Sequence, residues 1–173
     1  MNNFEFCNPV KVVFGKGSIA RLSALIPEGS RVLMVYGGGS IKKNGIYDQV
    51  TKALESFEVT EFPGIEANPH YETCMKAVEI VKEKKIDFLL AVGGGSVIDA
   101  TKFIAVSVGF EGDPWDILSK GGEIKNALPL GTVLTLAATG SEMNERSVIS
   151  RVSTCEKLNF ASPLVFPKFS VLD

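Results

Sequence analysis

The sequence has few of the side chains that bind metal ions or form redox pairs. It contains one histidine and three cysteines in 173 residues. His70 stands at the start of a predicted helix, where we expect it to be exposed rather than to bind a ligand. Cys7, Cys74 and Cys155 lie far apart and form no Cys-x-x-Cys pair. Because a zinc or iron site needs about three or four converging ligands, we predict no metal site in this chain.

The chain also lacks an excess of charge of one sign and any long apolar run. Lys and Arg number 18 against 20 Asp and Glu, which gives a formal net charge of -2. This balance gives no support to a nucleic-acid or membrane-surface partner. No apolar run approaches the roughly 20 residues that cross a bilayer, and the first residues do not resemble a signal peptide. We therefore expect a cytoplasmic protein with a small-molecule ligand.

The sequence does contain an alternation of apolar, β-prone runs and amphipathic stretches. This alternation is typical of an α/β domain, in which helices pack on a parallel sheet, and the length fits one domain. Residues 32–36 and 88–92 are predicted strands. After the first of them, apolar residues recur at helical spacing, at Tyr47, Val50, Leu54 and Phe57. The last third is predicted to extend the sheet by shorter strands without strong helices, at residues 132–136, 147–151 and 169–172.

A further helix is predicted between the first two strands. Asn68 followed by Pro69 is typical of a helix N-cap with proline at the first helical position. The apolar stripe that follows consists of Tyr71, Cys74, Met75, Val78 and Val81. The helix would end favourably for its dipole at Lys82, Lys84 and Lys85.

The sequence Gly-Gly-Gly-Ser occurs twice, each time between a predicted strand and a predicted helix. The two turns are Gly37, Gly38, Gly39, Ser40 and Gly93, Gly94, Gly95, Ser96. Glycines at such a turn let a ligand approach the backbone, and the free N–H groups and the helix dipole favour an anion. One such turn taken alone is about as often only a tight connection. Two in the same context favour a pair of phosphate sites.

The number of anion sites favours NADP over NAD. NADP has a pyrophosphate bridge and a separate 2'-phosphate, whereas NAD has only the pyrophosphate. A carboxylate usually accepts the ribose hydroxyls of NAD. Residues 37–40 contain no acid, and Lys42 and Lys43 follow them. Either lysine taken alone also fits a solvated helix start.

A third glycine turn, at residues 138–142, presents the hydroxyls of Thr139 and Ser141. It would close over the pyrophosphate or the nicotinamide ribose, or it satisfies only its own backbone. Asp99 lies one turn into the helix that follows the second Gly-Gly-Gly-Ser, near the expected ligand. An acid at that place is also a common partner of the helix dipole.

Four segments together resemble the iron-containing, group III alcohol dehydrogenases. They are Phe14-Gly15-Lys16-Gly17, residues 36–45 (YGGGSIKKNG), residues 93–105 (GGGSVIDATKFIA) and residues 134–144 (LTLAATGSEMN). The resemblance covers essentially the whole chain. It is strongest for the branch of NADPH-dependent aldehyde reductases and butanol dehydrogenases, in which glycine-rich GGGS stands where NAD-using relatives tend to have an acid.

This resemblance implies a Rossmann-like α/β fold similar to the N-terminal domain of dehydroquinate synthase. In the full-length enzyme an all-helical C-terminal domain would supply one Asp and three His to iron or zinc, so the metal is expected only there. We expect residues 1–173 to be the N-terminal NADP-binding domain, truncated before that helical domain. The chain alone is then expected to have no catalytic residue and no turnover.

The resemblance also assigns residues to parts of the cofactor. Within the first turn, Gly38 and Ser40 would hold the 2'-phosphate. The second turn would hold the pyrophosphate through Gly94, Gly95 and Ser96. Asn68 would reach the adenosine side. The ribose and nicotinamide end would be bound by Asp99, Thr135, Thr139, Ser141 and Lys157.

The reaction that the resemblance implies is hydride transfer between NADPH and short-chain aldehydes. The alternatives are a dehydroquinate synthase-like or glycerol dehydrogenase-like enzyme, and a non-catalytic nucleotide-binding module. The missing acid near Gly39 argues against the first of these. We also expect a homo-oligomer, a dimer, because the face that should pack on the helical domain would leave apolar surface exposed.

Overall fold

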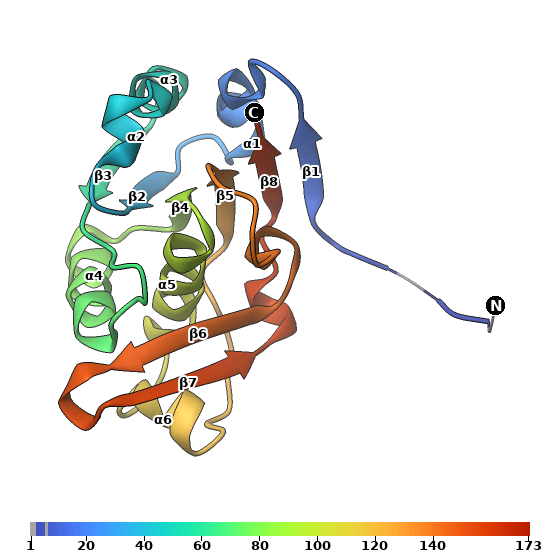
Figure 1. Cartoon of the computed structure of the whole chain (residues 1–173). Helices are drawn as coiled ribbons and strands as arrows, with labels where there is room; N and C mark the ends of the chain where they lie inside the picture. The colour runs from blue at the N-terminus through green and yellow to red at the C-terminus, as the bar shows by residue number, and fades with distance from the viewer. Residues whose placement is uncertain (1–2, 6) are drawn as a thin grey trace.

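The computed structural model describes residues 3–5 and 7–173 and is built on one parallel sheet. Its six strands run in the order β1-β8-β5-β4-β2-β3 (Figure 1). The strands are β1 Lys11–Phe14, β2 Arg31–Tyr36, β3 Glu58–Phe62, β4 Phe88–Gly93, β5 Leu130–Leu134 and β8 Phe169–Leu172. The predicted α/β class with a parallel sheet is confirmed. Within the described residues, no helix is long and apolar enough to cross a membrane.

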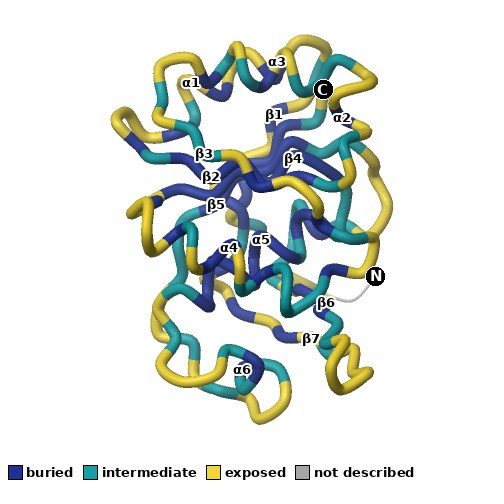
Figure 2. Tube along the Cα trace, turned by 90° about the vertical axis from the view of Figure 1, so that its left-hand side faces the viewer, coloured by how far each residue is buried: buried dark blue, intermediate teal, exposed yellow. Residues whose placement is uncertain are grey.

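Helices cover both faces of the sheet, and Figure 2 shows the strands as a buried layer between them. One face is covered by η1 Ser18–Arg21, α1 Leu22–Leu25, α2 Ser40–Lys43 and α3 Ile46–Ala53. The other is covered by α4 Tyr71–Lys84 and α5 Gly95–Ser107, with α6 Trp115–Ser119 farther out. The fold therefore has three layers, with a separate apolar core on each side of the sheet.

The inner strand β2, which lies between β4 and β3, shows how the sequence produces these two cores. Val32, Met34 and Tyr36 pack toward α3, whereas Leu33 and Val35 pack toward α4 and α5. All five side chains are buried because a parallel strand covered on both faces is apolar along its whole length. Each such side chain contributes about 1.5–3 kcal/mol to folding.

The strand order creates a topological switch point between β2 and β4. The chain leaves β2 through α2 and α3 toward β3, on one side, and leaves β4 through α5 toward β5, on the other. Because both crossovers are right-handed, α3 and α5 lie on opposite faces. In open α/β sheets, ligands bind outside the carboxyl ends of the strands at such a point. Both Gly-Gly-Gly-Ser turns begin there, with Tyr36 and Val92 as register partners.

The connection from β5 to β8 contains a second sheet that the sequence did not predict. Strands β6 Arg146–Arg151 and β7 Glu156–Ala161 form an antiparallel hairpin that packs on α5. The prediction that residues 147–151 extend the main sheet is therefore wrong. Their alternation of buried and half-buried residues suits either sheet, and only tertiary packing decides between them. The short helices of this region are η2 Ser141–Met143, η3 Val152–Thr154 and η4 Pro163–Val165.

Helix α4 begins later than predicted. His70, not Asn68, is its N-cap residue, and Pro69 lies outside the helix. The reason is tertiary, because His70 has extended backbone and forms a bridge with Ser150 of β6. The predicted apolar stripe is confirmed, since Cys74, Val78 and Val81 are buried. The His70 side chain is 35% exposed and lies beside Glu66.

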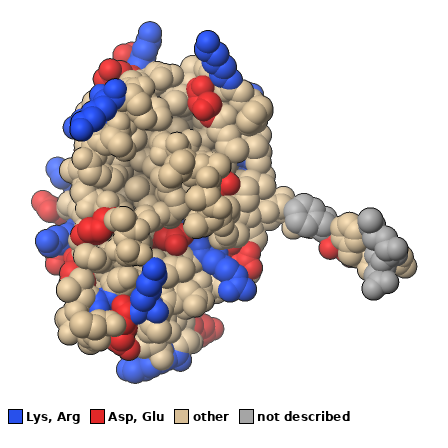
Figure 3. All heavy atoms as spheres, in the orientation of Figure 1, with Lys and Arg blue, Asp and Glu red and all other residues tan. Residues whose placement is uncertain are grey.

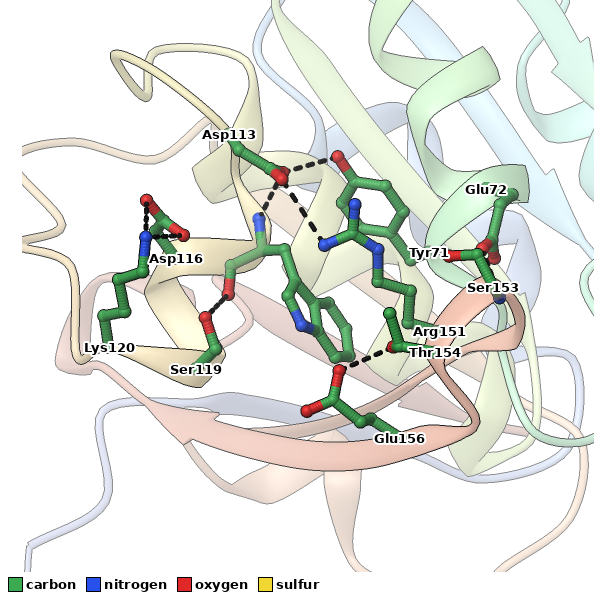
Figure 4. Close-up of polar contacts among 11 residues, drawn as sticks. Tyr71, Glu72, Asp113, Asp116, Ser119, Lys120, Arg151, Ser153, Thr154 and Glu156 are labelled. Carbon is green, nitrogen blue, oxygen red and sulfur yellow. Dashed lines mark hydrogen bonds and ion pairs between the residues drawn. The ribbon is translucent and has the colours of Figure 1, made fainter.

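The tip of the β6–β7 hairpin is fastened to the start of α4 and to the loop before α6 (Figure 4). The Arg151 guanidinium lies 4.6 Å from the ring centroid of Tyr71 and 5.5 Å from that of Trp115. Asp113 accepts a hydrogen bond of 2.6 Å from the Tyr71 hydroxyl and lies 3.4 Å from Arg151 Nη1. Glu72 accepts from two backbone N–H groups of η3. These contacts hold the tip of the hairpin against the start of α4 and the loop before α6.

Candidate nucleotide-binding site

The first glycine turn, residues 37–40, leaves β2 and opens onto a pocket. Gly39 has a φ of 97°, a left-handed conformation that favours glycine, and the short helix α2 starts at Ser40. The pocket has a volume of about 370 Å³ and is lined by Tyr36, Gly37, Gly38, Gly39, Lys42, Pro63 and Gly64. It therefore combines exposed glycine backbone with one cationic side chain.

Lys42 is held at this pocket by two tyrosines and faces an acid that the sequence analysis missed. Its Nζ lies 4.5 Å from the ring centroid of Tyr47 and 5.5 Å from that of Tyr36. Glu61 of β3 accepts hydrogen bonds from both phenols, at 2.7 Å from Tyr36 and 2.6 Å from Tyr47. Burial would raise the pKa of Glu61, but the two hydrogen bonds and Lys42 lower it below its ordinary value. Each carboxylate oxygen thus accepts one tyrosine hydroxyl.

The second glycine turn, residues 93–96, leaves β4 and leads directly into the long helix α5. A Cβ added at Gly94 would meet nothing closer than Leu136, at 3.8 Å, so this backbone is open. A Cβ at Gly95 would lie 2.5 Å from Thr139 Oγ1. The backbone N–H of Thr135 donates to the carbonyl of Gly93 at 3.1 Å. The structure therefore brings Thr135 and Thr139 to the second turn.

The segment between β3 and α4 connects the two turns. At its start, Gly64 donates its N–H to the carbonyl of Gly37 at 3.2 Å. Farther along, the carbonyl of Ala67 accepts from the hydroxyl of Ser96. Asn68 follows, and its Oδ1 accepts a hydrogen bond of 2.8 Å from Lys157 Nζ. Asn68 and the exposed Lys157 are thereby placed together beside the second turn.

Asp99 and Ser141 lie together on the far side of the α5 N-terminus. Asp99 accepts from the Ser141 hydroxyl at 2.6 Å and from the backbone N–H of Val148 at 3.1 Å. Burial raises the pKa of Asp99, although both hydrogen bonds and nearby Lys102 oppose this effect. Ser141 is only 2% exposed, and its hydroxyl also accepts from Lys102 at 3.0 Å. The Ser141 side chain therefore lies behind the surface of the site.

Sequence reasoning missed Lys102, which lies on α5 and is fully buried. Asp99 and Lys102 are the only charged residues of this helix. That isolated pair at i and i+3 was the signal available in the sequence. Among the described residues, no group of three or more His, Cys, Asp or Glu side chains could hold a metal ion.

The carboxyl edge of the sheet continues beyond the glycine turns as an apolar surface. A hollow of about 680 Å³ lies at the ends of β1, β5 and β8. Phe14 is 83% exposed and Leu136 is 69% exposed at its border. On the face drawn in Figure 3, the centre is largely uncharged, and side chains of both signs lie around its rim.

Comparisons with known proteins agree with this geometry. Residues 9–173 match the family of iron-containing alcohol dehydrogenases. The chain belongs to this family. It is 57% identical over 176 residues to the probable NADH-dependent butanol dehydrogenase 1 of Bacillus subtilis. It is equally similar, at 57%, to the NADPH-dependent aldehyde reductase YqhD of Escherichia coli. Each match covers 100% of this chain and 46% of the relative.

Solved structures of similar dehydrogenases and reductases have the same fold over the length of this chain. The crystal structure of YqhD from E. coli K-12 superposes with a TM-score of 0.95 at 56% identity, over 99% of this chain and 45% of that one. An NADH-dependent butanol dehydrogenase A from Thermotoga maritima gives a TM-score of 0.95 at 44% identity, over 100% and 44%. The chain thus spans less than half the length of these relatives and corresponds to their N-terminal domain. The relatives are named for different cofactors, so cofactor choice has to be argued from the site.

Proposed function

We propose that this chain is the NADP-binding domain of an alcohol dehydrogenase or aldehyde reductase. The main support is that two open glycine turns begin side by side at one switch point. Lys42 lines the pocket at the first of these turns. Two anion sites suit a ligand with a pyrophosphate and a separate phosphate.

The two turns would have separate tasks. Gly38 and Ser40 would bind the 2'-phosphate through exposed backbone N–H groups, with Lys42 as the counter-charge. The second turn would bind the pyrophosphate at the N-terminus of α5, where thirteen residues align their peptide dipoles. Asn68 and Lys157 border that turn and would contact the adenosine and nicotinamide sides.

Asp99, Thr135 and Thr139 would orient the nicotinamide ribose from the other side of the second turn. In the full-length enzyme, hydride would pass between NADPH and a short-chain aldehyde. Iron or zinc would polarise the aldehyde carbonyl. We place the metal ligands in the part of the relatives' length that lies outside the match, since the match covers 46% of YqhD. The apolar hollow beside the site would face that part, or a second subunit of a dimer.

An NADH-dependent enzyme is the second candidate, because Glu61 lies close to the first turn and the B. subtilis relative is named for NADH. A ribose-binding carboxylate has to reach the 2'- and 3'-hydroxyls in the pocket. Glu61 does not line the pocket at the first turn, whereas Lys42 does, and each Glu61 oxygen already accepts one tyrosine hydroxyl. We therefore favour NADP.

Titration of the purified chain with NADPH and NADH tests the proposal. We expect NADPH to bind more tightly, and Lys42→Ala to weaken NADPH about tenfold while leaving NADH unchanged, since one charge-assisted contact is worth about 1.5 kcal/mol. Lys43→Ala is the matched control, because Lys43 is exposed on the same helix and does not line the pocket. Tighter binding of NADH would overturn the cofactor assignment. Aldehyde reduction by the purified chain alone would overturn its assignment as a cofactor domain without catalytic residues.

A further inference from the structure

Lys102 is the one fully buried charged side chain among residues 3–5 and 7–173. It lies in the second turn of α5, with 0% exposure. An ammonium group taken out of water costs several kcal/mol unless its donors are satisfied. Burial accordingly lowers the pKa of Lys102 to about 8, although Asp99, Glu142 and Glu145 oppose this shift. The fold therefore keeps a charge here at a cost to its stability.

All of the hydrogen-bond partners of the Lys102 ammonium come from residues 139–146, a loop that ends on the first residue of β6. Its Nζ lies 2.6 Å from the carbonyl of Ser141, 2.8 Å from that of Asn144 and 2.9 Å from that of Arg146. The side-chain oxygens of Ser141 and Asn144 lie at 3.0 and 3.1 Å. The three N–H donors of the ammonium group are thus shared among five acceptor oxygens, and none of these oxygens belongs to α5. The contact ties residues 141–146 to the helix.

Asp99 holds the same loop from a neighbouring position on α5. Its carboxylate accepts from the hydroxyl of Ser141 and from the N–H of Val148. Lys102 and Asp99 meet at Ser141, so the buried ammonium is compensated through one hydroxyl rather than by a direct ion pair. The loop is fixed between two opposite charges on one helix.

This loop begins at the residue that touches the second glycine turn. Thr139 Oγ1 lies where a side chain at Gly95 would stand, and Ser141 follows two residues later. A shift of the loop would therefore move Thr139 relative to the backbone N–H groups of the turn. An apolar side chain in place of Lys102 would avoid the desolvation cost, but it would leave the loop oxygens without donors.

We propose that Lys102 is a positioning residue of the nucleotide site, which holds residues 139–146 against the start of α5 and so sets the affinity for the cofactor pyrophosphate. The proposal rests on the proposed function. It goes beyond that function because Lys102 itself would not contact the nucleotide.

The test is Lys102→Met, which keeps the length of the stem and removes the ammonium. We expect NADPH and NADH to bind about tenfold more weakly, in the same proportion, because the pyrophosphate is common to both. We also expect faster hydrogen exchange at the amides of Met143, Arg146 and Val148, which are hydrogen-bonded within this network. Lys82→Met, on the exposed side of α4, is the control and should change neither measurement.

Asn144→Ala approaches the same contact from the loop, in case Lys102→Met fails to fold. It removes one of the five oxygens and also the acceptor of the Arg146 N–H, so only the exchange of Met143 and Val148 is compared. We expect a smaller change in the same direction in both measurements. Unchanged affinity together with unchanged exchange of the loop amides, in either folded variant, would overturn the proposal. If the parent chain binds neither nucleotide, the proposed function fails, and hydrogen exchange alone then decides whether Lys102 positions the loop.

Discussion

Replacement of Gly38 by alanine tests the first glycine turn without disturbing the fold. The backbone at Gly38 lies outside the left-handed region, and no atom lies within 4 Å of an added Cβ. The new methyl group thus meets neither strain nor a clash. Because alanine reduces the freedom of the unfolded chain, the free energy of unfolding should stay the same or rise by about 0.4–1 kcal/mol.

Binding should respond differently, because Gly38 lines the pocket at the first turn. The methyl group would keep a phosphate from the backbone and remove about one charge-assisted hydrogen bond, worth about 1.5–3 kcal/mol. This corresponds to roughly 10- to 150-fold weaker binding of NADPH. NADH has no 2'-phosphate and should bind as before.

Gly94→Ala is the matched variant at the second turn, where the nearest atom to an added Cβ is 3.8 Å away. We expect it to weaken NADPH and NADH alike. Calorimetric titration of both variants with both nucleotides measures the four affinities, and urea unfolding checks their stability. If Gly38→Ala weakens both nucleotides equally, or neither, the assignment of separate phosphates to the two turns is refuted.

The remaining predictions concern stability and reactivity. Gly131→Ala would place a Cβ 2.3 Å from the Phe169 ring in the sheet and should destabilise the chain by about 1–3 kcal/mol in urea unfolding. Burial raises the pKa of Cys74, so a thiol reagent at pH 8 should modify the two exposed cysteines and reach Cys74 only in denaturant. The pKa of Lys102 is lowered from 10.5 to about 8, so the unfolded chain binds more protons between these values. The parent chain should therefore gain stability relative to Lys102→Met as the pH rises from 8 to 10.5, and a constant difference would contradict this.

The central strands could be predicted from the sequence because their burial leaves a local signature. Strands β2 and β4 lie inside the sheet, and their residues 32–36 and 88–92 are all buried. The predicted strand at residues 169–172 coincides with β8. The outer strands β1 and β3 and the hairpin strand β7 were not predicted. In β3, for example, Glu58 and Glu61 are exposed and only Phe62 is buried, so the apolar pattern is too short to identify a strand.

The candidate site likewise has one part that the sequence predicts and one part that it does not. The glycine turns could be found because their conformation depends on a few adjacent residues. Glu61 could not, since it reaches Tyr36 only through the pairing of β2 with the unpredicted β3. The same holds for the contact between Asn68 and Lys157, which are 89 residues apart and meet only because the hairpin docks on the start of α4. The sequence therefore identifies turns that are formed by adjacent residues. It does not identify contacts between residues that lie far apart in the chain.

The strand order is what converts two local turns into one site. Tyr36 and Val92 are register partners on neighbouring strands, so the two turns start about 5 Å apart at the edge of the sheet. From there the chain continues to α2 and α3 on one face and to α5 on the other. A ligand that contacts both turns must therefore cross the edge of the sheet. It would contact helices that pack into two separate apolar cores. A substitution in one turn should then leave the packing beneath the other turn unchanged. For this reason, binding to Gly38→Ala and Gly94→Ala can distinguish the two phosphate sites.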